Sequence, residues 1–93
     1  MPFVIKHKIT AELFTCSLIN IYDFKYHGVK VWDRSDVAQA EFASVLLEHG
    51  LDELWDWELV ELSENQTKMG NVKLNNNTAR RLYLNAEGKL EAK

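Results

Sequence analysis

One segment of the chain has the apolar spacing of an amphipathic helix, and strand-like segments flank it on both sides. Within residues 33–49 a period close to 3.6 residues is carried by Val37, Ala40, Phe42, Val45 and Leu46. Asp33 or Ser35 can cap the first turn, and Gly50 can end the helix because glycine adopts left-handed backbone at low cost. The pattern therefore predicts one helix over about residues 35–49.

The chain before this helix predicts three strands. Residues 3–10 alternate in the manner of a strand, and one face of it would carry Phe3, Ile5, His7 and Ile9. Residues 13–24 are rich in β-branched and aromatic side chains but do not alternate cleanly, which indicates that both faces are covered or that a bulge shifts the phase. His27 and Gly28 predict a two-residue turn between the second and third strands.

The chain directly after the helix fits two interpretations. Apolar residues in 51–62 match a helical stripe, and they also match a strand with one shift of phase. We favour a turn through Leu54 and a strand over about residues 55–63, because Gly50 separates this segment from the helix and residues 57–62 have good strand chemistry.

A short resemblance accompanies this strand. Residues 57–60 read Trp-Glu-Leu-Val and resemble the Gly-Trp-Glu-Leu-Val strand that follows the helix in some small bacterial domains of unknown function. Asp56 stands where that pattern has glycine, and the resemblance covers four residues. It therefore implies nothing about an activity, a partner or a site.

The last third of the chain predicts a polar loop followed by short strands. The loop covers residues 64–70, and turns follow from Asn75 and from Gly88. The segments expected as short strands are residues 72–74, 80–84 and 89–92. The whole chain, residues 1–93, is then one α+β domain: a meandering, mostly antiparallel sheet with one helix on one face, in the order βββαβββ(β).

The charges are distributed unevenly along the chain. The net charge is −3, and this weak value argues against general attraction to nucleic acid or to anionic lipid. Residues 33–64 carry ten acidic residues and one basic residue, whereas the segments before and after them are basic. The acidic segment is either paired with bases across the fold or exposed as a face for a basic partner.

Several classes of site have no motif in the sequence. Cys16 is the only cysteine, so an internal disulfide and a multi-cysteine zinc site are excluded. The histidines lack the spacing of metal ligands, and no nucleotide-binding glycine motif occurs. We expect no catalytic residue, no metal and no cofactor, which favours a non-enzymatic protein without deciding the question.

Location follows from similar observations. The longest run without a charged residue, 13–22, is too short to span a membrane, and the N-terminus lacks the pattern of a secretory signal. A single free thiol is typical of a reducing compartment. We therefore expect a cytoplasmic protein without a membrane segment.

The predicted strand after the helix carries the candidate interaction residues, namely Trp55, Trp57, Glu58 and Glu61. Exposed tryptophan surrounded by charge is typical of protein interfaces, although both tryptophans could instead pack under the helix. We predict a small acidic interaction or regulatory domain. Its partner is a protein, either a different one or a second copy, because open strand edges and a small core are typical of homodimers.

Two alternatives remain open. The first is a small-ligand-binding domain or a minor enzyme with a pocket between helix and sheet, whose polar groups would be His7, Cys16, Tyr22 and Tyr26. Simpler roles for these residues are packing for His7 and burial for Cys16. The second is nucleic-acid binding through Lys73, Arg81 and Tyr83. The sequence argues against it, because such modules carry a denser stripe of basic and aromatic residues.

Overall fold

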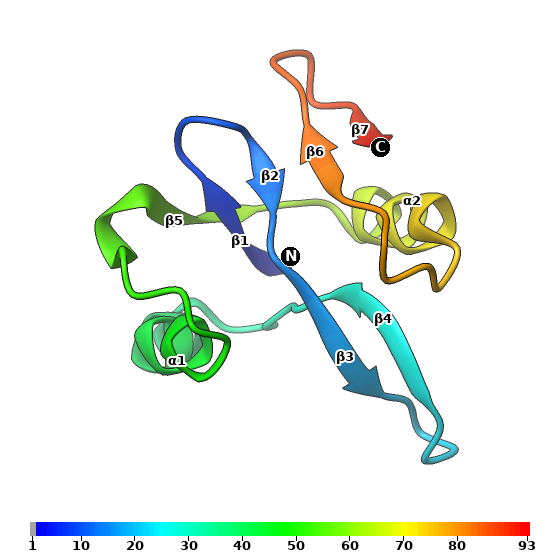
Figure 1. The fold of residues 1–93 in the computed structure, drawn as a ribbon, viewed down its shortest axis with the longest axis horizontal. Coiled ribbons are helices and arrows are strands. Elements are labelled where there is room, and N and C mark those ends of the chain that lie inside the picture. Colours follow the sequence, from blue (N-terminus) through cyan, green and yellow to red (C-terminus); the bar gives the residue numbers. More distant parts are fainter. Residues whose placement is uncertain (1) are drawn as a thin grey trace.

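Over residues 2–93, which a computed structural model describes, the chain forms two α-helices and two antiparallel sheets (Figure 1). The larger sheet has the spatial order β5 (Trp57–Glu61), β1 (Phe3–His7), β2 (Glu12–Leu13), β6 (Leu82–Leu84) and β7 (Leu90–Ala92). A separate hairpin consists of β3 (Thr15–Ile19) and β4 (Lys25–Val29). The helices are α1 (Ser35–Glu48) and α2 (Glu64–Leu74), and a 3-10 turn, η1 (Leu54–Asp56), precedes β5.

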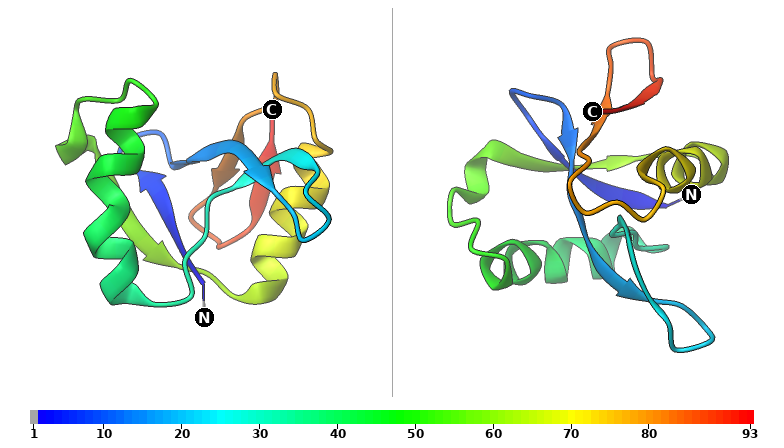
Figure 2. Two further views of the ribbon diagram at one scale, coloured as in Figure 1. Left: turned by 90° about the horizontal axis from the view of Figure 1, so that it is seen from below. Right: turned by 45° about the vertical axis from the view of Figure 1, so that its right-hand side comes forward.

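The larger sheet is covered on both faces. Val4 and Ile5 are neighbours in β1 and both are completely buried, which an alternating strand achieves only when each face packs against something. Figure 2 shows α1 and α2 on opposite sides of the molecule with the strands between them. We call the two groups of buried residues that result the α1 cluster and the α2 cluster.

Each cluster joins one helix to one face of β1. The α1 cluster comprises Ile5, Phe14, Cys16, Trp32, Ala38 and Leu46. The α2 cluster comprises Val4, Leu13, Val29, Leu62, Leu74, Leu82 and Leu90. Because adjacent residues of β1 belong to different clusters, this strand connects the two halves of the core.

The prediction of a single helix is wrong, because residues 64–74 form α2 and neither a loop nor a strand. The helix begins with a capping box: the Ser63 hydroxyl accepts a hydrogen bond from the Gln66 N–H at 3.0 Å, and the Gln66 side chain accepts one from the Ser63 N–H at 2.8 Å. It ends at Asn75, whose φ of 50° is left-handed. The polar sequence conceals this helix because only one narrow face is buried.

The predicted turn at His27 and Gly28 is also wrong, because both residues lie inside β4. The chain turns instead between Asn20 and Phe24. The Asn20 side-chain oxygen accepts hydrogen bonds from the N–H groups of Tyr22 at 2.9 Å and Phe24 at 3.1 Å, which holds the turn from within. The predicted strand over 13–24 therefore divides into β2, β3 and this turn.

Other predictions agree with the structure in part. The helix expected over about residues 35–49 is α1, although its N-cap is Arg34 and no side chain caps it. The strand expected after Leu54 is β5, which supports the strand interpretation of residues 51–62. The strand order differs from a meander, because β5 returns beside β1 and the β3–β4 hairpin leaves the larger sheet.

Candidate functional site

β5 forms one edge of the larger sheet, and no strand in the described part of the chain pairs with its outer side. The Leu62 N–H donates to the carbonyl of Pro2 at 2.9 Å, so the even-numbered residues of this segment bond to β1. Antiparallel strands alternate in this respect, and the main chains of Leu59 and Glu61 therefore point to the open side. Such an edge can accept one further strand.

The four candidate interaction residues all lie at this edge, but they differ in exposure. Trp55, on η1, is 71% exposed. Trp57 is half-buried against the α1 cluster, with its ring edge-on to that of His7 at 4.8 Å between centroids. Glu61 is exposed on the α1 side of the sheet, and Glu58 is half-buried on the α2 side. Trp55 is thus available to a partner, and Trp57 is a packing residue.

A cavity of about 280 Å³ opens beside this edge. Its lining consists of His7, Gly50, Leu51, Asp52, Glu53, Asp56 and Trp57. The protonated Glu53 carboxyl can donate a hydrogen bond to the Asp56 carboxylate, which raises the pKa of Glu53, and the negative charge of Asp56 raises it further. Crowded carboxylates of this kind favour the approach of a positive group.

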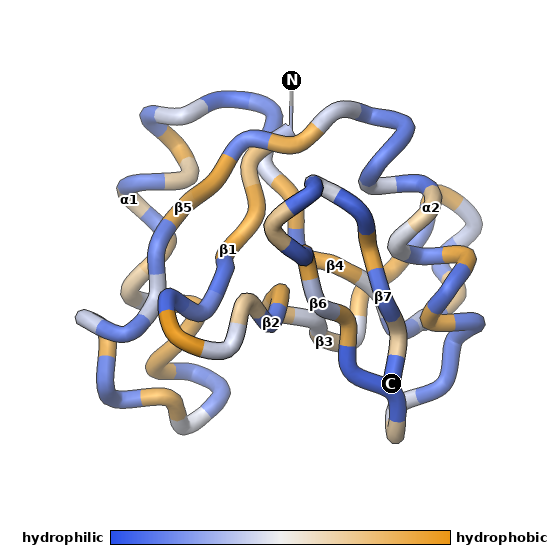
Figure 3. The backbone as a smooth tube through the Cα atoms, turned by 90° about the horizontal axis from the view of Figure 1, so that it is seen from above, coloured by the Kyte–Doolittle hydropathy of each residue, from blue (hydrophilic) through white to orange (hydrophobic). Residues whose placement is uncertain are grey.

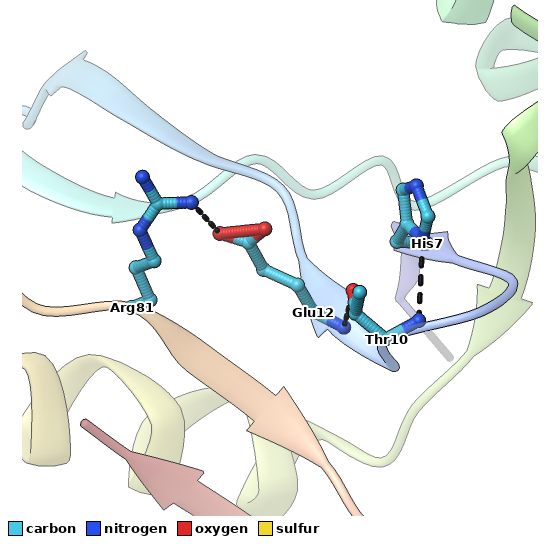
Figure 4. A network of polar contacts seen from close by, with 4 residues as sticks. All are labelled: His7, Thr10, Glu12 and Arg81. Carbon is cyan, nitrogen blue, oxygen red and sulfur yellow. Dashed lines mark hydrogen bonds and ion pairs between the residues drawn. The ribbon is translucent and has the colours of Figure 1, made fainter.

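His7 has a structural task at this cavity. Its Nδ1 accepts hydrogen bonds from the N–H groups of Ile9 and Thr10, each at 3.2 Å, and so holds the turn between β1 and β2 (Figure 4). The neutral ring then carries its proton on Nε2. At the start of β2, the Glu12 carboxylate pairs with the Arg81 guanidinium at 3.2 Å.

The structure places the four residues of the predicted pocket in different surroundings. His7 lines the cavity described above, whose lining includes none of the other three. Cys16 lies in the α1 cluster, where burial raises the pKa of its thiol and nearby Lys30 opposes part of that effect. Tyr22 is exposed at the end of the β3–β4 hairpin, and Tyr26 is half-buried on β4.

Of the three residues considered for nucleic acid, Arg81 and Tyr83 have partners within the fold. Arg81 pairs with Glu12, and the ammonium of Lys93 lies 5.4 Å from the centre of the Tyr83 ring. Lys73 lines a different cavity, of about 250 Å³, between α2 and the β6–β7 hairpin. Two of the three side chains are thus paired within the fold.

Sequence reasoning missed one exposed apolar surface, the end of the β3–β4 hairpin. The exposed residues there are Ile19, Ile21, Tyr22 and Phe24, and Ile21 is 91% exposed. The sequence predicts a strand here, with both faces covered or a bulge that shifts the phase, because β-branched and aromatic residues favour strands. Asn20, a residue that favours turns, was the signal that could have located this end.

No group of three or more potential metal ligands occurs within residues 2–93, and no helix there is long and apolar enough to cross a membrane. Comparison with protein-family models, with curated proteins and with solved structures finds no match to this chain.

Proposed function

We propose that this protein is a non-catalytic interaction or regulatory domain of the cytoplasm, and that its partner is a basic, extended protein segment bound along β5. The observation that carries the proposal is the open edge of β5 next to a cluster of carboxylates. A cytoplasmic location agrees with a single cysteine that lies buried as a free thiol.

The main chain of β5 would supply most of the affinity. Leu59 and Glu61 direct their N–H and C=O groups outward, so an added strand can form regular antiparallel or parallel hydrogen bonds with them. This mode of binding tolerates many side chains, and the specificity then depends on what surrounds the edge.

The surroundings of β5 favour basic side chains. Glu61 is exposed on the strand itself, and Glu53 and Asp56 line the cavity at its beginning. Opposite charges across an interface accelerate binding and select the partner. Trp55 offers a large exposed ring next to these acids, and tryptophan is among the residues that contribute most to protein interfaces.

The opposite edge of the sheet provides a natural contrast. β7 has three residues, Leu90–Ala92, and Lys89 and Lys93 flank it. A basic segment would meet repulsion there. Glu91 is exposed on β7, as Glu61 is on β5, so the same change of charge can be made at either edge.

The test uses a synthetic nonapeptide of alternating lysine and valine, titrated into the full chain by calorimetry and by amide NMR. We expect Glu61→Lys to weaken binding by roughly tenfold or more, because it places like charges together. Glu91→Lys changes the net charge equally and should leave the affinity almost unchanged. Trp55→Ala should weaken binding by roughly fivefold.

Two controls decide the result. The same peptide with glutamate in place of lysine should not bind, and binding of the lysine peptide should weaken as salt is added. Equal losses in the Glu61→Lys and Glu91→Lys variants would mean that only net charge matters, and the proposed site would then be rejected. The proposed site would also be rejected if the peptide shifted the amide NMR signals only of residues outside β5.

A further inference from the structure

The β3–β4 hairpin stands apart from the larger sheet. Its strands pair from Thr15 with Val29 to Ile19 with Lys25, and it projects from the rest of the molecule in both figures of the ribbon (Figures 1 and 2). An isolated two-stranded hairpin is only marginally stable in water. Its stability therefore depends on the burial of Cys16 and Val29 in the core and on what its two outer edges contact.

The outer edge of β4 is already covered. The N–H of His27 donates to the side-chain oxygen of Asn76 at 2.7 Å, and the N–H of Val29 donates to that of Asn71 at 3.0 Å. The side-chain amide groups of Asn71 and Asn76 therefore take the place that a neighbouring strand would occupy. The outward N–H groups of β4 in this stretch are therefore satisfied by residues of α2 and of the turn that follows it.

The outer edge of β3 has no corresponding cover in residues 2–93. The Asn20 N–H donates to the carbonyl of Phe24 at 3.0 Å, so even-numbered residues bond across the hairpin. The odd-numbered residues of β3, namely Thr15, Ser17 and Ile19, consequently direct their main-chain groups outward.

This edge also lacks the usual protection against pairing. Exposed edge strands commonly carry lysine, proline or an inward charge, which discourage association. Residues 13–22 contain no charged residue and no proline. Ser17 is exposed, and so is Ile19.

We propose that β3 pairs antiparallel with β3 of a second copy of this chain, about a two-fold axis at Ser17. In this register Ser17 lies opposite Ser17 of the partner subunit, and Thr15 lies opposite the partner's Ile19. Every outward N–H and C=O of the strand then acquires a hydrogen-bond partner. Pairs of β-branched residues stabilise antiparallel sheets, and no like charges face each other across the contact.

Charge distinguishes this edge from that of β5. A second copy at β5 would bring together two acidic segments, each with ten acidic residues and one basic residue over 33–64. The resulting repulsion disfavours self-association there and favours a basic partner. The uncharged edge of β3 carries no such penalty. The β3 edge is a different surface from the β5 edge, so dimerisation at β3 does not depend on the function proposed for β5.

The experiment measures the mass of the full chain by sedimentation equilibrium from micromolar to about 1 mM protein. We expect a monomer–dimer equilibrium. Ser17→Lys places two ammonium groups at the two-fold axis and should raise the dimer dissociation constant by roughly tenfold or more. Ile9→Lys is the matched control, because Ile9 is 80% exposed and lies outside the hairpin; it should leave the dissociation constant unchanged.

Amide exchange in the unmodified chain provides a second measurement that needs no variant. The amides of Ser17 and Ile19 should exchange more slowly as the protein concentration rises, whereas those of Cys16 and Leu18, already bonded within the hairpin, should change less. A monomer throughout the concentration range would overturn the proposal. A dimer that Ser17→Lys leaves intact, with no change in exchange at Ser17, would overturn it too.

Discussion

The two helices of this protein are specified in different ways. α1 has no side-chain N-cap, and its position follows from apolar residues such as Leu46 that pack into the α1 cluster. α2 is hydrophilic along much of its length (Figure 3) and begins with a complete capping box at Ser63. The two helices therefore differ in how they begin, although each has two buried residues, Ala38 and Leu46 in α1 and Gly70 and Leu74 in α2.

α2 also packs closely against the sheet, at Gly70. Gly70 is buried, and a Cβ atom there would lie 2.8 Å from Cδ2 of Leu82 and 3.3 Å from Cδ1 of Leu90. The helix gives up some intrinsic stability at a glycine, by about 1 kcal/mol relative to alanine. In return, α2 approaches β6 and β7 without displacing the side chains of Leu82 and Leu90.

Core substitutions on the two sides of the sheet should have the largest effects. Leu46→Ala and Leu74→Ala each remove a completely buried side chain and should lower the free energy of unfolding by about 3 kcal/mol. Because β1 belongs to both clusters, we expect each variant to unfold in one transition. Tryptophan fluorescence and far-UV circular dichroism in urea would test this. A second transition in either variant would show that the two halves unfold independently.

The elements that the sequence predicted are those with a strong local pattern. α1 has the helical apolar period, and β1 and β5 have strand chemistry, so all three were recognised. α2 was missed although Ser63 and Gln66 have the spacing of a capping box, because its polar composition suggested a loop. The capping box at Ser63 is a better guide to this helix than its polar composition.

Long-range contacts explain the other errors. Gly28 reads as a turn residue, yet it lies in β4, where an added Cβ would be 2.8 Å from the side-chain oxygen of Asn71. A contact between residues so far apart leaves no mark in the local sequence. The candidate site could be predicted only in part, for the same reason. The sequence predicts the strand that carries Trp57 and Glu61, but the position of this strand at the sheet edge depends on its pairing with β1.

The capping box gives a direct test of the contrast between the helices. Ser63→Ala removes the hydroxyl that accepts from Gln66 and should lower the free energy of unfolding by about 1 kcal/mol. Ser35→Ala is the control, because Ser35 is exposed at the start of α1 and provides no cap bond; it should change stability by less than about 0.5 kcal/mol. Equal losses, measured by urea unfolding, would contradict the difference described between the two helix starts.

The smallest expected effect is a change in the pKa of Glu53, which lines the cavity beside β5. The pKa of Glu53 is raised by the hydrogen bond and the charge of Asp56, so Asp56→Asn should lower it, as followed by carboxyl 13C NMR. Glu87→Gln, on the turn before β7, should leave the pKa of Glu53 unchanged. A raised folded-state pKa favours the protonated native state, so this contribution to stability is present below the ordinary glutamate pKa and is lost as the pH rises through the raised pKa.

This titration also connects the pKa of Glu53 to the proposed partner. A basic peptide bound along β5 brings positive charge near Glu53 and should lower the pKa of its carboxyl, because a cation stabilises the ionised form. Binding would then release protons at a pH between the free and bound pKa values, and the measured binding enthalpy would vary with the ionisation enthalpy of the buffer. A peptide that binds without moving the pKa of Glu53 would occupy some other part of the molecule. The carboxylate cluster of Glu53 and Asp56 would then be a solvated surface with no part in binding.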